Sequence, residues 1–275
     1  MTATKLRIKS TFEELATGNR AALITFITAG DPNLETSMQI LDALPDAGAD
    51  LIELGMPFTD PMADGPIIQL SSQRALKSGH NTHRTLEMVR KFRRQNQHTP
   101  IILMGYFNPI YTYGISEFCH DASTAGVDGL IVVDLPPEED EQLRKPAKTS
   151  DIDFIRLTTP TSDTKRLPRL VTNASGFIYH VSVAGITGAQ TAKQKSLEKS
   201  LSQIRKHTDL PIAVGFGIKT PKDVMNIAKI ADAAVVGSAI IQKIADGSDS
   251  SHMVENVIAF VRSLSNAVQM GRLDQ

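Results

Sequence analysis

Short apolar stretches rich in Val, Ile and Leu alternate with longer amphipathic stretches along the whole chain. The apolar stretches have the length of buried parallel strands, and strand followed by helix, repeated in this way, predicts an α/β protein with a closed (β/α)₈ barrel. The eight predicted strands are residues 23–28, 51–55, 101–105, 129–134, 154–157, 177–181, 212–215 and 233–237. The stretches between them have helical spacing, as in residues 34–47 and 221–230.

A doubly wound open sheet would give the same alternation, so periodicity alone leaves both folds open. The position of unusual polar residues favours the barrel. Glu53, Tyr106 and Asp134 all lie toward the carboxyl ends of predicted strands, and this is the end at which barrel enzymes gather their chemistry.

Further helices are predicted outside the regular repeat. A helix that begins at Ser10, with Glu13 or Glu14 in a capping box, is expected to close the floor of the barrel. Two helices separate the second and third strands, a short extra helix starts at Ser238 after the eighth strand, and a last helix follows a polar connector. Their predicted ranges are 67–78, 83–95, 238–244 and 253–268. Because the chain contains no linker or low-complexity segment, we expect one domain over residues 1–275.

Composition narrows the class of protein. With 275 residues, 41% of them apolar, the chain can bury a full hydrophobic core. Its 29 basic and 30 acidic residues nearly cancel, so no net positive charge favours binding to nucleic acid. The basic cluster at 90–94 is interpreted as a solvated helix face. The chain shows neither the apolar core of a signal peptide nor a stretch long enough to span a bilayer. We therefore expect a cytoplasmic protein without a membrane role.

Metal and thiol chemistry have no support in the sequence. The single cysteine, Cys119, lies in a helical pattern and is interpreted as a small buried hydrophobe. The seven histidines form no set with metal-ligand spacing. No metal site is predicted.

The most unusual stretch is residues 51–66, where an apolar strand that contains Glu53 breaks into a loop with three prolines. Side chains alternate along a strand, so Glu53 shares a face with Leu51 and Gly55 and is poorly solvated there. Desolvation raises the pKa of a carboxyl group and suits it to proton transfer. The loop then adds Asp60 and Asp64. On these residues alone, a glutamate held in a structural ion pair remains an alternative.

Glycine-rich loops follow the last three predicted strands, at 184–188, 215–217 and 237–241. In barrel enzymes these loops and the start of a short extra helix commonly bind phosphate through backbone N–H groups. We found neither Lys nor Arg beside these glycines, and so expect an anion held by N–H groups and helix dipoles. The polar stretch 188–196 is predicted to be a mobile lid, with an ordinary surface loop as the alternative.

The run of residues from Glu53 to Pro66 resembles the signature of the tryptophan synthase alpha chain family, and the resemblance extends from Phe12 to the last helix. It implies a (β/α)₈ carbon–carbon lyase that splits indole-3-glycerol phosphate into indole and glyceraldehyde 3-phosphate, in the last steps of tryptophan biosynthesis. Glu53 and Asp64 match the family's catalytic residues. In this retro-aldol step Glu53 would transfer the protons, while Asp64 would accept the indole N–H.

The resemblance also implies binding residues and a partner. Phe26 and Ile131 would line the indole slot, Tyr106 and Tyr179 would touch substrate near Glu53, and Thr187 would close the lid against Asp64. The phosphate would be bound by Gly188, Gly217, Gly237 and Ser238. The partner is a beta chain that carries pyridoxal phosphate in an alpha2-beta2 heterotetramer and receives indole through a tunnel. Its contacts would be Pro57, Asp60, Asn108 and Pro109. No cofactor or metal is implied for this chain itself.

Three other readings stay open at this point. A stand-alone lyase that releases free indole shares every catalytic residue. A sugar-phosphate isomerase barrel would have no special need for Asp64. A phosphate-ligand sensor or scaffold would not need the acid at Glu53.

Overall fold

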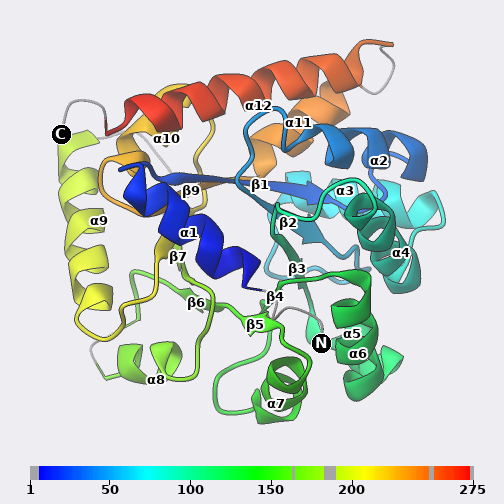
Figure 1. Cartoon of the computed structure of the whole chain (residues 1–275), viewed down its shortest axis with the longest axis horizontal. Coiled ribbons are helices and arrows are strands. Elements are labelled where there is room, and N and C mark those ends of the chain that lie inside the picture. The colour runs from blue at the N-terminus through cyan, green and yellow to red at the C-terminus, as the bar shows by residue number, and fades with distance from the viewer. Residues whose placement is uncertain (1–5, 163–164, 183–189, 248–250, 273–275) are drawn as a thin grey trace.

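Parallel strands form a ring at the centre of the molecule, and helices surround it (Figure 1). The computed structural model describes residues 6–162, 165–182, 190–247 and 251–272. The ring runs in the order β5-β4-β3-β2-β1-β9-β8-β7-β6. The strands are β1 (Ala22–Thr28), β2 (Leu51–Gly55), β3 (Ile101–Gly105), β4 (Gly129–Val132), β5 (Asp153–Phe154), β6 (Arg156–Thr158), β7 (Ile178–Val181), β8 (Ile212–Gly215) and β9 (Ala233–Val236).

The ring closes at the fifth predicted strand, which the structure divides into β5 and β6. β5 pairs with β4, while β6 pairs with β7. Between them, the Ile155 N–H donates to the Leu130 carbonyl at 3.0 Å. The chain thus changes its pairing partner within a few residues, as the stagger of a tilted barrel requires. Because β5 and β6, the two end strands of this order, are separated only by Ile155, the sheet closes on itself. The open-sheet alternative is excluded and the (β/α)₈ prediction is confirmed.

The helices cover the outside of the ring. Local sequence signals fix several helix starts: Asn33 and Asn81 accept backbone N–H groups as N-caps, and Thr220 forms a capping box with Asp223. The helices are α1 (Arg7–Thr17), α2 (Leu34–Ala43), α3 (Pro66–Lys77), α4 (Thr82–Arg93), α5 (Phe107–Tyr113), α6 (Ile115–Ala125), α7 (Glu141–Thr149), α8 (Leu167–Val171), α9 (Gln190–Arg205), α10 (Pro221–Ala228), α11 (Ser238–Asp246) and α12 (Met253–Met270).

Helix α1 closes one end of the barrel, as predicted, but it starts earlier than predicted. It begins at Arg7 without a side-chain cap, so the expected start at Ser10 is wrong. The Arg7 guanidinium donates to Asp128 at 2.7 Å and to the Gln97 carbonyl at 2.6 Å. These tertiary contacts stabilise the additional turn. Farther along, the Phe12 ring packs 5.8 Å from the Phe177 ring in the barrel interior.

Side chains of the strands alternate between the interior of the ring and the layer under the helices. Leu51 belongs to the inner cluster, whereas Ile52 and Leu54 belong to the cluster between strands and helices. Glu53 therefore faces the interior, as the strand pattern predicted. Helix α1 covers the lower end of this interior, so the site has to open at the carboxyl ends of the strands.

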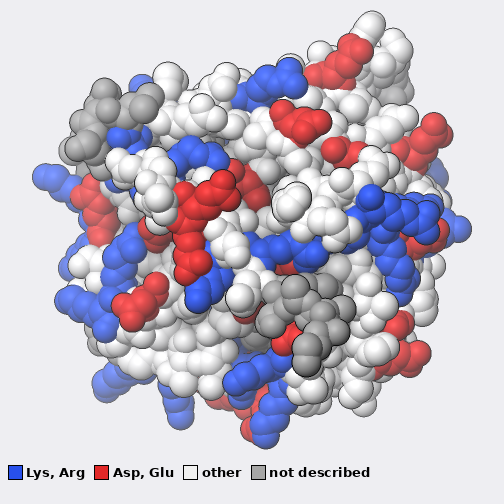
Figure 2. Space-filling model, in the orientation of Figure 1, with Lys and Arg blue, Asp and Glu red and all other residues white. Residues whose placement is uncertain are grey.

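Charged side chains of both signs are interspersed on the face that carries α1 (Figure 2). Lys and Arg side chains gather over α4 at the edge of this view, and Asp and Glu lie close by. In the described part of the chain, no helix is long and apolar enough to cross a membrane.

Candidate functional site

A cavity of about 300 Å³ opens at the carboxyl ends of the strands. Side chains from β1, β2, β3, β7 and β9 line its inner part, and the loops before α3, α10 and α11 line its mouth. Residues far apart in the sequence meet here because all parallel strands of a barrel end at the same side. Glu53 and Asp64 both belong to the lining.

Glu53 is the most unusual side chain of the cavity wall, because it is a fully buried acid (0% exposed) without a polar partner among the residues described. Neither of its carboxyl oxygens has a hydrogen-bond partner in the described part of the chain. Burial raises the pKa of Glu53 to about 8, so the group carries a proton at neutral pH. The structural ion-pair alternative has no support, since no cation among the described residues contacts this carboxyl group.

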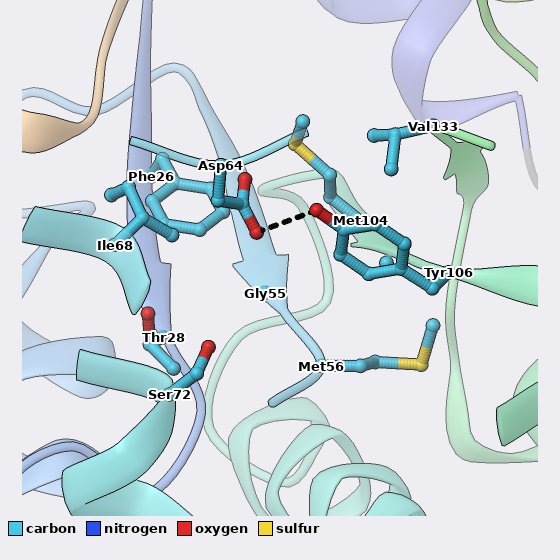
Figure 3. Close-up of a pocket in the computed structure, with 11 residues that line it drawn as sticks. Phe26, Thr28, Gly55, Met56, Asp64, Ile68, Ser72, Met104, Tyr106 and Val133 are labelled. Carbon is cyan, nitrogen blue, oxygen red and sulfur yellow. Dashed lines mark hydrogen bonds between the residues drawn. The ribbon is translucent and has the colours of Figure 1, made fainter. Parts of the chain in front are cut away.

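Asp64 lies in a different environment at the mouth of the cavity. The Tyr106 hydroxyl donates to the Asp64 carboxylate at 3.0 Å and accepts the Ala63 N–H at 3.0 Å. Figure 3 shows Asp64 and Tyr106 pointing toward each other, with Phe26 and Ile68 beside the carboxylate. Burial raises the pKa of Asp64, and the hydrogen bond from Tyr106 opposes that rise. The two acids therefore differ in hydrogen bonding: the Asp64 carboxylate accepts a hydrogen bond from Tyr106, whereas the Glu53 carboxyl group has no donor among the described residues.

The two tyrosines predicted near Glu53 have different positions. Tyr179 is buried in the cavity wall, and this burial, together with the charge of an ionised Glu53, raises the pKa of its hydroxyl. Gly215 leaves room for it, since a Cβ there would overlap the Tyr179 hydroxyl. Tyr106 instead lies in a small adjoining pocket, with its hydroxyl on Asp64 and its ring 5.4 Å from that of Phe58. Tyr106 thus contacts the loop acid and does not line the cavity around Glu53.

Of the two residues predicted to line the indole slot, Phe26 lines the cavity and Ile131 does not. Phe26 lines the cavity beside Glu53, its register partner on the neighbouring strand. Gly55 accommodates the Phe26 ring, because a Cβ there would lie 2.6 Å from Cζ. Ile131 is fully buried in the inner cluster and is not among the residues that line the cavity.

Glycine-containing loops before α10 and α11 form the far end of the cavity, which is lined by Gly217, Gly237 and Ser238. Helix α11 begins at Ser238, so its N-terminal N–H groups lie at this end. Lys219 also lines the cavity. The sequence analysis found no Lys or Arg beside these glycines, but the turn into α10 places Lys219 in the cavity lining, two residues after Gly217.

Phe216 is a cavity residue that the sequence reasoning missed. It has a φ of 83°, a conformation that a bulky side chain rarely adopts, and it is 55% exposed. It stands between Gly215 and Gly217, and the pattern of the sequence alone does not separate such a residue from an ordinary turn. Strained backbone of this kind often occurs at ligand-binding sites.

The lid stretch is only partly described. Thr187 and Gly188 lie outside the described residues. From Gln190 onward the predicted lid is the start of helix α9, so the loop interpretation is wrong for most of 188–196. Ala, Lys, Gln and Leu favour helix, and they outweigh the polar, small-residue composition that suggested a loop.

The model of the family described as "Tryptophan synthase alpha chain" matches residues 12–269. Tryptophan synthase subunit alpha from Legionella pneumophila superimposes with a TM-score of 0.89 and 38% identity, covering 95% of this chain and 98% of that one. A chain of Mycobacterium tuberculosis tryptophan synthase gives a TM-score of 0.87 and 31% identity, covering 96% and 98%.

The chain belongs to the tryptophan synthase alpha chain family. Members of this family are carbon–carbon lyases of tryptophan biosynthesis. They cleave indole-3-glycerol phosphate to indole and glyceraldehyde 3-phosphate, and pass the indole to a beta chain. The chain therefore has this enzymatic function and a beta subunit as its partner.

The residues matched to the family's beta-chain contacts differ in exposure. Asp60 and Asn108 are exposed, Pro109 is half-buried, and Pro57 is buried within the chain. Pro57 therefore offers little surface of its own. Met62 stands near Asp60 and is 83% exposed. Among the described residues, no group of three His, Cys, Asp or Glu is placed to hold a metal ion.

Proposed function

We propose that Glu53 performs both proton transfers in the cleavage of indole-3-glycerol phosphate by this chain. Indole C3 must gain a proton, and the hydroxyl on the neighbouring chain carbon must lose one. Protonated Glu53 gives its proton to C3, and the resulting carboxylate takes the hydroxyl proton as the carbon–carbon bond breaks and the aldehyde forms. The observation that carries this role is the burial of an unpartnered Glu53 with a pKa of about 8.

Asp64 supplies the second role. Its carboxylate accepts the indole N–H and stabilises the positive charge that develops when C3 is protonated. The hydrogen bond from Tyr106 supports this role, because it favours the ionised form of Asp64 and fixes its direction. Tyr106 thus acts as a positioning residue in this proposal.

The other cavity residues bind substrate. Phe26 and Tyr179 contact the indole ring, with Ile131 packed behind them. The N-terminal N–H groups of α11 bind the phosphate. The phosphate-binding residues in this proposal are Gly217, Gly237 and Ser238, with Lys219 adding a positive charge and Gly188 contributing from outside the described residues. Thr187, also outside the described residues, would close the lid against Asp64.

We further propose that the chain works as one domain, residues 1–275, in an alpha2-beta2 heterotetramer in the cytoplasm. Pyridoxal phosphate would then belong to the beta chain, and this chain would need no cofactor or metal of its own. Exposed Asp60 and Asn108, with half-buried Pro109, would contact the partner, and buried Pro57 would support the loop beneath them. The high exposure of Met62 beside Asp60 supports an interface at this loop.

The test is indole release from indole-3-glycerol phosphate by wild type, Glu53→Gln and Asp64→Asn, each with and without a beta chain. We expect turnover of the wild type to rise by orders of magnitude with the partner. Both variants should lose turnover by about 10²-fold or more while substrate binding is kept. Full activity without a beta chain would support the stand-alone lyase instead. Unimpaired turnover by Asp64→Asn or Glu53→Gln would contradict the roles given to these acids.

A further inference from the structure

A second cavity, also of about 300 Å³, lies outside the barrel ring between β7, α9 and α10. Tyr179 and His180 are consecutive residues of β7, so their side chains point to opposite faces of the strand. Tyr179 lines the substrate cavity, and His180 lines this second one. Ser196, at its edge on α9, is exposed, so the second cavity opens to solvent.

His180 lines this cavity and carries a ring nitrogen that is unpaired within the described residues. The side chain is buried (1% exposed), and its Nδ1 lies 3.0 Å from the Thr158 hydroxyl. Its Nε2 has no hydrogen-bond partner in the described part of the chain. Burial also lowers the pKa of His180 to about 4, so the ring is uncharged at neutral pH. In the tautomer with its proton on Nδ1, directed to Thr158, Nε2 is an acceptor without a described partner.

The rest of the lining is an apolar wall with a few uncharged polar groups. Leu197, Ile227 and Ile230 are among the apolar lining residues, and the uncharged polar ones include Ser182, Gln194, Ser196, Ser200 and Asn226. Among the described residues that line the cavity, the charged side chain is Asp223. Its carboxylate already accepts the N–H groups of Lys219 and Thr220 at the start of α10. Since the described lining residues include no Lys or Arg, this part of the cavity does not suit an anion.

We propose that this cavity is a second ligand site, which binds a small uncharged aromatic molecule through one N–H or O–H group directed at His180 Nε2. Indole has this chemistry, with a flat apolar body and one N–H donor, and the chain itself releases it. Gly217 and Ile218 line both cavities. An occupant of the second site therefore contacts the same loop that forms the phosphate end of the substrate cavity.

The test follows the ring nitrogens of His180 by NMR in the full-length chain labelled with ¹⁵N-histidine, as indole is added. We expect the Nε2 resonance of His180 to move saturably, because a new hydrogen bond forms at that atom. His80 is also buried and neutral but does not line this cavity, so it should remain unchanged. Gly217 and Ile218 line both cavities, so a movement caused by indole in the substrate cavity alone has to be distinguished. Such a movement would persist when the second cavity is filled by a larger side chain.

A filled-cavity variant gives the control. Ile230→Trp extends into the second cavity from the end of α10 and should abolish the movement of the His180 resonance without loss of basal indole release. Leu197→Trp fills it from α9 and serves if Ile230→Trp fails to fold. An unmoved His180 resonance at millimolar indole, or a movement that persists in the filled variant, would overturn the proposal. Loss of catalysis in Glu53→Gln tests the proposed function separately.

Discussion

At the scale of single residues, the burial of Glu53 links catalysis to stability. In the folded chain the pKa of the carboxyl group is about 8, whereas in an unfolded chain the same group ionises near its ordinary pKa of 4.5. Between these values the folded state binds more protons than the unfolded state. The free energy of unfolding therefore decreases as pH rises from about 4.5 to about 8, by up to about 1.4 kcal/mol per pH unit.

Glu53→Gln removes this ionisation while keeping a side chain of the same size. We expect the variant to equal the wild type in stability near the lower end of that pH range and to exceed it by about 2–4 kcal/mol at pH 8. Urea unfolding at the two pH values measures this difference. Glu139→Gln, at an exposed position, should show no such pH dependence. Equal effects of Glu53→Gln at both pH values would mean that Glu53 is ionised in the folded chain.

Tyr106 tunes the second acid. Since its hydrogen bond opposes the rise in the pKa of Asp64 caused by burial, Tyr106→Phe should raise that pKa further. We expect the acidic limb of the pH–rate profile for indole release to move to higher pH. Tyr113→Phe is the matched control, because its hydroxyl donates to Asp121 at 2.6 Å outside the cavity lining. An unmoved acidic limb in Tyr106→Phe would contradict the role of Tyr106.

The contribution of the Lys219 charge to substrate binding can be tested by substitution. An exposed charge contributes less than about 1 kcal/mol to binding an anion. Lys219→Met should therefore raise KM for indole-3-glycerol phosphate by up to about fivefold, with kcat nearly unchanged and with a smaller effect at high salt. Lys222→Met, exposed on α10 but outside the cavity lining, is the control. An equal rise in KM for both variants would indicate a general charge effect.

The sequence predicts some of these residues and not others for physical reasons. Glu53 could be predicted because a strand has a fixed side-chain period, so its inward direction follows from that of Leu51. Phe216 and Lys219 were missed or excluded because their place in the lining depends on the path of a turn. The path of a turn produces no periodic pattern in the sequence, so it could not be predicted in this way.

At the scale of elements, the strands were predicted well and the helix boundaries less well. A buried strand is defined by the short apolar stretch itself. The first turn of α1 depends on the contact of Arg7 with Asp128, which joins distant parts of the chain. Helix α2 ends at Ala43, before its predicted end, because Pro45 lacks the N–H needed to continue the helix.

Helix α1 gives a direct test of the barrel floor. The Phe12 side chain is buried in the inner cluster against Phe177. Phe12→Ala should therefore lower the free energy of unfolding by about 3 kcal/mol, measured by urea unfolding. Glu14→Ala, at an exposed position of the same helix, should change it by less than about 0.5 kcal/mol. A small effect of Phe12→Ala would mean that α1 is not part of the core.

At the scale of the whole molecule, the ring depends on the junction at which β5 ends and β6 begins. Arg156, the first residue of β6, forms a buried ion pair with Asp140, which also accepts the Arg144 guanidinium at 3.1 Å. This contact joins the closing strand to the start of α7. The sequence predicted the strand, but the change of pairing partner is a property of the closed ring and has no local signal.

Removal of one partner from this buried pair should be costly. We expect Arg156→Met to lower the free energy of unfolding by about 3 kcal/mol, because Asp140 then stays buried with less compensation. Arg156→Met combined with Asp140→Asn should cost at least about 1 kcal/mol less than the sum of the two single variants. Arg205→Met, which breaks an exposed pair with Asp232, should cost under about 1 kcal/mol. Additive effects at 156 and 140 would show that the pair does not couple.

The pH dependence of kcat/KM for indole release, measured with the beta chain present, tests the central claim most directly. That claim is that a buried, protonated Glu53 starts the cleavage. Since kcat/KM reports the ionisation of the free enzyme, we predict that it falls above about pH 8, where Glu53 loses its proton. A profile that stays level from pH 7 to well above the pKa of about 8 would contradict the assignment of Glu53 as the acid.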